Sequence, residues 1–251
     1  MCHTDIPPGQ ARPDIDGREV TIPLPGGEEM PALHVAARDD APPVLVIGDV
    51  FGRSAFYEHL AALLAQAGLQ ALVPDFFFRQ GPLPDPPSKE AAFGRRAKLD
   101  EAAALDDLRA AITWLRERSG RRGVGVVGFC MGGTFVLDLA STEAELVSVA
   151  YYGFPVPQPT IASPPPRPID LVDGLRGPVL AFWGDQDDTV GVDHARDYVR
   201  RAQSHAGFES QILPGLGHGF LGAAPLGDAS DPGAATWERA VTFLHDHLEE
   251  R

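Results

Sequence analysis

The chain has 251 residues, of which 35 are Asp or Glu and 21 are Lys or Arg, so the formal net charge is −14. This length is enough for one domain with a sizeable core, and a composition that is 44% hydrophobic and 22% charged is typical of a globular protein, not a disordered one. The acidic balance argues against a nucleic-acid-binding protein, which needs a basic surface.

The first part of the chain predicts an arm followed by a hairpin. Residues 1–17 are rich in proline and have no periodicity, so we expect an N-terminal arm before one domain over residues 18–251. Two short apolar runs, 20–22 and 32–35, flank Pro25-Gly26-Gly27. Because glycine favours tight turns, this pattern predicts an antiparallel hairpin.

Strand and helix patterns then alternate to the end of the chain. Continuous apolar runs such as 44–47 are typical of strands buried on both faces in a parallel sheet. The alternation predicts an α/β fold with a mostly parallel central sheet and helices on both faces. The expected strands are 44–47, 69–73, 123–129, 147–152, 179–183 and 210–213, and the expected helices are 54–67, 88–118, 132–140, 192–206 and 234–248.

The segment Gly128-Phe129-Cys130-Met131-Gly132-Gly133 carries the strongest chemical signal. It lies between a predicted buried strand and a predicted helix, and it has the G-x-nucleophile-x-G form of a nucleophile elbow, with cysteine as the nucleophile. The glycines let strand and helix pack closely around a strained turn. The positive end of the following helix favours a thiolate and helps to hold an oxyanion.

Such an elbow needs an acid and a histidine later in the chain, in that order. Asp185, Asp187 and Asp188 follow the strand 179–183, and His218 follows the strand 210–213, so all lie at carboxyl ends of strands. We favour Asp187 as the acid, although chain order alone does not separate it from the other two aspartates.

These residues and several further segments resemble the dienelactone hydrolase family, which are α/β-hydrolases with a Cys-Asp-His triad. The similarity spans nearly the whole chain after the arm. Besides the elbow, it includes Asp49-Val50-Phe51-Gly52, Pro74-Asp75 with Arg79, Tyr151-Tyr152-Gly153, Gly184-Asp185-Gln186-Asp187 and Gly217-His218.

The resemblance implies a role for each matched residue. Cys130 would be the nucleophile, Asp187 the acid and His218 the base. The backbone N–H groups of Met131 and Val50 would form the oxyanion hole. Arg79 would bind a substrate carboxylate, and Phe51 and Tyr152, in the matched segments, would line the substrate site.

Two positions depart from the family pattern. The family usually has Glu where this chain has Asp49, and that carboxylate takes part in activating the thiol, so the shorter Asp49 must make the contact differently or lose it. The founding members carry a second substrate-binding arginine where this chain has Gly222. Half of the anion-binding pair is therefore missing, which argues against dienelactone itself as the natural substrate.

The sequence thus predicts a hydrolase of a small-molecule ester or lactone that uses no cofactor and no metal. We expect a cytoplasmic monomer or dimer with no membrane or nucleic-acid partner, since the chain has no long apolar run and no signal-peptide pattern. A carboxylesterase or thioesterase for neutral acyl substrates remains an alternative, as does a non-catalytic protein with Cys130 as a redox sensor.

Three other patterns are interpreted as structural. The run 123–128 matches G-x-G-x-x-G but coincides with a predicted strand, so we reject dinucleotide binding. The acidic cluster 185–188 lacks the glycine and the closing glutamate of a calcium loop. Cys2 and His3 lie on the N-terminal arm, where we expect no functional role for either.

Overall fold

The computed structural model describes residues 3–7, 9–157 and 165–249. Within these residues one sheet has the strand order β1-β2-β4-β3-β5-β6-β7-β8. β1 pairs antiparallel with β2, and β2 antiparallel with β4, whereas all later pairings are parallel. The strands are β1 Gly17–Pro23, β2 Glu29–Ala36, β3 Pro43–Ile47, β4 Gln70–Pro74, β5 Val124–Phe129, β6 Leu146–Tyr151, β7 Val179–Gly184 and β8 Phe208–Leu213.

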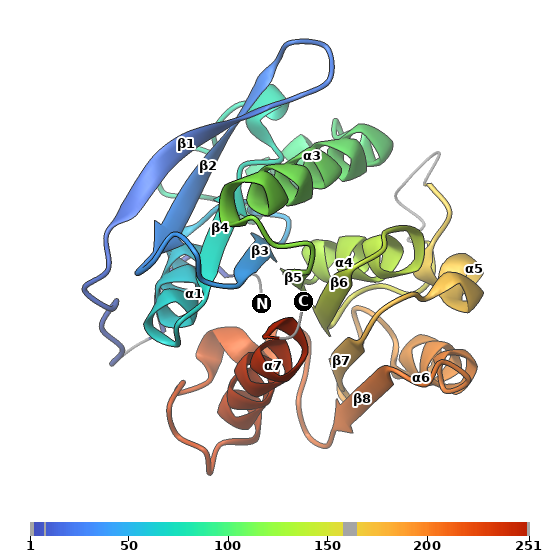
Figure 1. Ribbon diagram of the computed structural model, residues 1–251. Helices are drawn as coiled ribbons and strands as arrows, with labels where there is room; N and C mark the ends of the chain where they lie inside the picture. The colour runs from blue at the N-terminus through green and yellow to red at the C-terminus, as the bar shows by residue number, and fades with distance from the viewer. Residues whose placement is uncertain (1–2, 8, 158–164, 250–251) are drawn as a thin grey trace.

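Helices cover both faces of this sheet. α1 and α7 lie on one face, and α3 and α4 lie on the other (Figure 1). This is the mostly parallel α/β sheet with an N-terminal hairpin that the alternating patterns predicted, and it has the α/β-hydrolase architecture that the family resemblance implied. The helices are α1 Ala55–Gln66, α2 Lys89–Arg96, α3 Glu101–Ser119, α4 Met131–Thr142, α5 Pro168–Leu171, α6 Val192–Ala202 and α7 Pro232–Leu248.

The central strands are buried along their whole length. Every residue of β3, β5, β6 and β7 is buried, as expected for continuous apolar runs between two helical layers. Residues 124–128 of the run 123–128 belong to β5, so Gly125 and Gly128 lie in a strand and Gly123 directly precedes it, unlike the turn between strand and helix that a dinucleotide fingerprint requires.

One predicted helix is wrong. The segment 88–118 forms two helices, α2 and α3, and not one. The carboxylate of Asp100 accepts hydrogen bonds from the backbone N–H groups of Ala102 and Ala103 and so begins a new helix. Because the residues on both sides of Asp100 favour helix, the sequence pattern did not indicate that one helix ends and another begins there.

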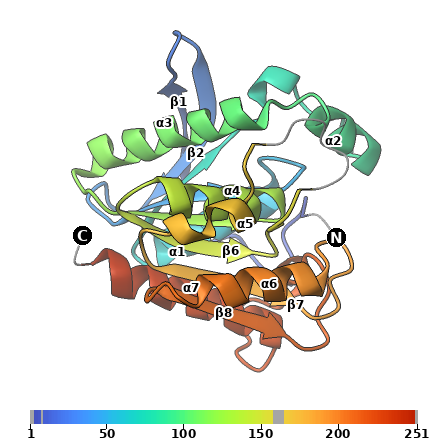
Figure 2. The same cartoon turned by 90° about the vertical axis from the view of Figure 1, so that its right-hand side faces the viewer.

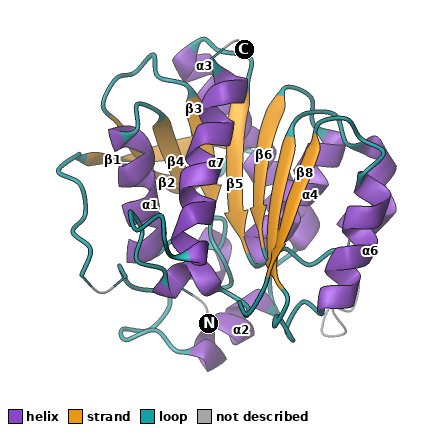
Figure 3. Ribbon diagram, turned by 90° about the horizontal axis from the view of Figure 1, so that it is seen from below, coloured by secondary structure: helices purple, strands orange, loops and turns teal. Residues whose placement is uncertain are grey.

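The carboxyl ends of the parallel strands meet at one edge of the molecule. The N-terminal end of the chain and α2 lie at this same edge (Figures 2 and 3). In α/β sheets this edge is where active sites form. No helix among the described residues combines the length and the apolar character needed to cross a lipid bilayer.

Candidate active site

Cys130 occupies the sharp turn between β5 and α4. Its backbone has φ 56° and ψ −116°, a positive φ that is costly for a residue with a side chain and is characteristic of strained functional positions. A Cβ on Gly132 would lie 2.3 Å from the carbonyl oxygen of Ile47, at the end of β3. Glycine at 132 therefore allows the start of α4 to touch the end of β3, which is the close packing that the elbow pattern predicted.

Asp187 is the aspartate that meets the histidine. His218 Nδ1 lies 2.8 Å from Asp187 Oδ2. The other carboxylate oxygen of Asp187 accepts hydrogen bonds from the backbone N–H groups of Thr189 and Val190, at 3.0 and 2.9 Å. Because a carboxylate only accepts, the proton of the neutral imidazole resides on Nδ1, and Nε2 remains able to take a proton.

The two other acidic candidates, Asp185 and Asp188, have different surroundings. Asp185 Oδ1 accepts a hydrogen bond from the backbone N–H of Gly215 at 2.7 Å, which ties the loop after β7 to the loop after β8. Asp188 is exposed. Distance therefore favours Asp187 over the other two aspartates, since its carboxylate lies 2.8 Å from His218 Nδ1.

The residues after β6 lie between the cysteine and the histidine. The carbonyl of Tyr151 accepts the backbone N–H of Cys130 at 3.0 Å. The ring of Tyr152 packs edge-on against His218, with 5.1 Å between ring centroids. Tyr152 has a positive φ of 41°, so its backbone is strained in the manner of Cys130. One strained loop therefore contacts both sides of the site.

The predicted oxyanion-hole residues lie at two adjoining backbone turns. Met131 is the first residue of α4, and the N–H groups of a helix's first turn have no partner within the helix. Val50 is buried in the loop after β3. This loop is shaped by Asp49, whose Oδ1 accepts the N–H of Phe51 at 2.8 Å. Both amides thus belong to turns that meet where β3 approaches α4.

Asp49 is fully buried. Burial raises its pKa above the ordinary aspartate value, and hydrogen bonds from the backbone N–H groups of His3 and Phe51 partly oppose that change. Burial also raises the pKa of Tyr57, and the charges of Asp49 and Cys130 add to the effect. Tyr57 therefore interacts with both Asp49 and Cys130, and all three side chains are buried.

His3, for which we expected no functional role, is buried and lies beside the predicted site residues. His3 is 5% exposed, and its Nε2 lies 2.8 Å from the hydroxyl oxygen of Tyr152. Its backbone N–H donates to Asp49 Oδ2 at 2.8 Å. Cys2, the other half of that expectation, lies outside the described residues.

Gly222 is explained by the same histidine. A Cβ on Gly222 would lie 1.9 Å from His3 Nδ1, so the imidazole fills the space that any side chain at position 222 would need. The imidazole of His3, from the other end of the chain, therefore occupies the space in which a second substrate-binding arginine at position 222 would begin.

Arg79 is engaged in ion pairs away from the cysteine. It belongs to the short helix η1 (Phe78–Gln80). Its guanidinium bonds both carboxylate oxygens of Asp107, at 2.5 and 3.1 Å, and Nε donates to Glu28 at 2.9 Å. This arrangement joins the hairpin, η1 and α3, and it favours a structural role for Arg79 over carboxylate binding.

Two other arginines, which sequence analysis missed, lie closer to the site. Arg95 Nη2 donates to the carbonyl of Phe51 at 2.7 Å, and its guanidinium lies over the ring of Phe77. Arg96 lines a small cavity together with Met131 and Phe154. The signal available in the sequence was the adjacent arginine pair at the end of a helix that follows a proline-rich loop.

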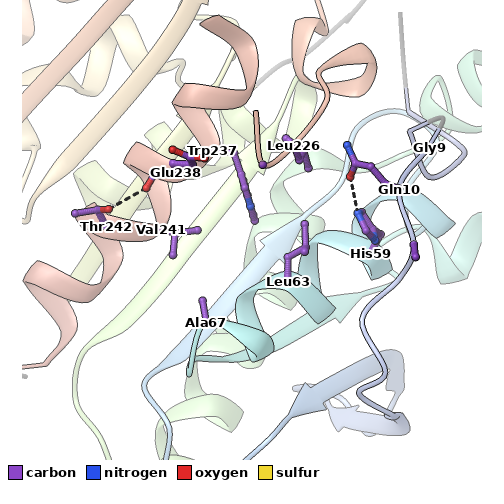
Figure 4. A pocket seen from close by; sticks show the side chains of 12 residues that line it. Gly9, Gln10, His59, Leu63, Ala67, Leu226, Trp237, Glu238, Val241 and Thr242 are labelled. Atoms are coloured by element: carbon purple, nitrogen blue, oxygen red, sulfur yellow. Dashed lines mark hydrogen bonds between the residues drawn. The ribbon is translucent and has the colours of Figure 1, made fainter. Parts of the chain in front are cut away.

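The larger cavities lie elsewhere. A groove of about 580 Å³ runs between α1 and α7, with Leu63 and Trp237 in its wall and the Gln10–His59 hydrogen bond at its edge (Figure 4). None of the predicted site residues lines it. Over the described residues no cluster of His, Cys, Asp and Glu is arranged to hold a metal ion.

The fold and the elbow define the chain as an α/β-hydrolase. The family model described as the dienelactone hydrolase family matches residues 30–248, and the chain belongs to this family. It is 33% identical to a carboxymethylenebutenolidase of Rhodococcus opacus over 258 residues, covering 99% of this chain and 98% of the relative. It is 36% identical to carboxymethylenebutenolidase 2 of Cupriavidus pinatubonensis over 191 residues, covering 76% and 78% of the two chains.

A solved structure agrees with this membership. A crystal structure of dienelactone hydrolase type from Klebsiella pneumoniae superposes with a TM-score of 0.81 at 28% identity, covering 92% of this chain and 98% of that one. An esterase of Pyrococcus furiosus, at 16% identity and a TM-score of 0.69, shares the fold. Membership of the family and the two carboxymethylenebutenolidase relatives support a hydrolase that acts on lactones or esters.

Proposed function

We propose that the protein hydrolyses a small ester or lactone through an acyl-cysteine intermediate. The proposal rests on one observation above the others, namely the 2.8 Å contact of Asp187 with His218 Nδ1 in a chain whose strained elbow residue is Cys130. This arrangement supports a mechanism in which Nε2 of His218 accepts the proton and Cys130, at the N-terminus of α4, is the nucleophile.

The first half of the reaction forms the acyl-enzyme. His218 takes the thiol proton of Cys130, and the sulfur adds to the substrate carbonyl carbon. The carbonyl oxygen becomes an oxyanion, which accepts hydrogen bonds from the N–H groups of Met131 and Val50. The intermediate collapses with cleavage of the carbon–oxygen bond, and the leaving alkoxide takes the proton from His218. In a lactone this alcohol stays attached to the acyl group.

The second half releases the acid. Water gives a proton to His218 as its oxygen adds to the thioester carbon. The same two amides hold the new oxyanion, and collapse breaks the carbon–sulfur bond. The thiolate recovers its proton from His218. All steps use groups of the chain and water, and no cofactor enters.

A neutral substrate is the second candidate within this chemistry. His3 prevents a charged side chain at position 222, and Arg79 is occupied by Asp107 and Glu28. These two observations favour a neutral ester or thioester over a substrate that carries a carboxylate next to His218.

Trapping the intermediate tests the proposal. We expect rapid acid quenching during turnover of a p-nitrophenyl ester to give a protein heavier by the acyl group, with the added mass on the peptide that contains Cys130. Cys130→Ala should show neither the adduct nor turnover, because loss of a nucleophile costs many powers of ten in rate. Turnover by Cys130→Ala above a few per cent of wild type would refute the mechanism. A stable sulfenic acid on Cys130 without turnover of any lactone or ester would favour the sensor alternative.

A further inference from the structure

The N-terminal arm reaches into the active site through one residue, His3. Three hydrogen bonds fix it: the backbone N–H donates to Asp49, the carbonyl accepts from Ser54 Oγ, and the ring Nε2 meets the hydroxyl of Tyr152, each at 2.8 Å. The imidazole also packs on Phe56, with 4.5 Å between ring centroids. A residue held in this way has a defined position beside the base and the thiol-activating carboxylate.

The space for His3 is provided by Gly222. The backbone of this glycine has no positive φ within the range that disfavours side chains, so conformation does not require glycine there. Space does, because a Cβ would lie 1.9 and 2.2 Å from the atoms Nδ1 and Cε1 of His3. The two positions, at opposite ends of the chain, are sterically matched.

The imidazole is uncharged where it lies. Burial lowers the pKa of His3 to about 3, and the nearby charge of His218 contributes to the lowering. The groups that face it are the carboxylate of Asp49 at its backbone, the hydroxyl of Tyr152 at Nε2 and the ring of Tyr57. A neutral ring can serve the Tyr152 hydroxyl as hydrogen-bond partner without placing a cation beside the base.

We propose that His3 is a positioning residue for hydrolysis, which fixes the ring of Tyr152 against His218. The proposal rests on the proposed function. Tyr152 is the contact through which His3 acts, because its ring packs edge-on against His218 and its backbone is strained at φ 41°. A strained residue keeps its conformation only when the surroundings hold it, and the bond from His3 holds the far end of its side chain.

A pair of substitutions separates hydrogen bonding from packing. His3→Phe keeps an aromatic ring on Phe56 but removes the nitrogen that meets the Tyr152 hydroxyl, and His3→Gln keeps a polar group that can meet the hydroxyl. Both retain the backbone bonds to Asp49 and Ser54. We expect kcat/KM to fall about five- to thirtyfold in His3→Phe, the range for one lost buried hydrogen bond of about 1–2 kcal/mol, with most of the loss in kcat. We expect His3→Gln to stay within about threefold of wild type.

Two cycles and one control complete the experiment. Tyr152→Phe combined with His3→Phe should cost no more than the larger single loss, because both remove the same bond. Gly222→Ala should reproduce the His3→Phe loss in the wild-type background, but should cost little more in a His3→Ala background, where the ring is absent. Thr4→Ala is the matched control on the arm, since the Thr4 hydroxyl donates an exposed hydrogen bond to the neighbouring Asp5, and its kinetics should equal those of wild type.

The outcome separates this inference from the proposed function. If Cys130→Ala is inactive and His3→Phe retains wild-type kcat, hydrolysis through Cys130 stands and the positioning role of His3 is refuted. If His3→Phe lowers thermal stability while kcat and the pH profile of kcat/KM stay unchanged, His3 only anchors the arm, and the inference is again refuted. If Cys130→Ala remains active, the proposed function itself fails.

Discussion

Replacing Asp187 with asparagine isolates the role of its charge in orienting His218. The amide oxygen of the substituted side chain can take over the two backbone hydrogen bonds from Thr189 and Val190 that now end on Oδ1. The NH₂ group must then face His218 Nδ1, 2.8 Å away. Two donors cannot share that contact, so the imidazole is forced to carry its proton on Nε2, where it cannot act as a base.

The expected loss in kcat is about ten-thousandfold, the cost of the wrong tautomer in a serine triad, which corresponds to about 5.4 kcal/mol of transition-state stabilisation. Initial rates on a p-nitrophenyl ester, with active sites titrated by iodoacetamide, measure it. Asp185→Asn is the matched control two residues away, because its amide oxygen can still accept the N–H of Gly215; we expect less than a threefold change. A larger loss in Asp185→Asn, or more than a tenth of wild-type activity in Asp187→Asn, would refute the assignment.

Three further predictions concern charge. Asp49→Asn should shift the pH dependence of Cys130 alkylation, since the buried carboxylate interacts with the thiol's surroundings; an unaltered profile would make Asp49 a structural residue. Arg79→Ala should lower the thermal midpoint and should affect a carboxylate-bearing lactone and its neutral methyl ester equally, because the guanidinium is paired with acids; loss of activity on the anion alone would restore the carboxylate-binding role. The pKa of His3 is about 3 in the folded protein, whereas an unfolded histidine titrates near 6.5. Between about pH 6.5 and pH 3 the unfolded chain therefore binds a proton at His3 that the native chain does not, so the free energy of unfolding falls as the pH falls through this window. In urea titrations His3→Gln should show a dependence shallower by up to about 1.4 kcal/mol per pH unit, and an unchanged slope would mean that the ring titrates normally.

The parts of the site that depend on local sequence pattern could be predicted from the sequence. The spacing of the glycines predicts the elbow around Cys130, and a continuous apolar run predicts the strand before it. The carboxyl ends of strands were predictable in the same way, so His218 and the group of three aspartates were correctly placed at one edge. Choosing Asp187 among the three required the resemblance or the structure, because chain order gives all of them the same strand end.

The sequence could not supply contacts between distant loops. His3 meets Asp49 and Tyr152 across 46 and 149 residues, and no periodic pattern marks such a pair. Arg79 lies on the matched segment, yet its partner Asp107 belongs to a helix whose beginning was itself mispredicted. In both cases the outcome depends on which side chain fills a particular space, and that is decided by tertiary packing.

The distribution of charge around the site has a consequence for substrate choice. Near His218 lie the neutral imidazole of His3 and the aromatic rings of Tyr152 and Phe154. On the Met131 side a cavity of only about 10 Å³ is lined by Arg96, Glu101 and Arg167, and the carboxylate of Glu101 forms ion pairs with both arginines. Burial lowers the pKa of Arg96, but a guanidinium stays protonated at any physiological pH. Because both arginines there are already paired with a carboxylate in a very small cavity, we expect no strong preference for an anionic group near Met131, whereas the aromatic rings around His218 favour an apolar group on the substrate.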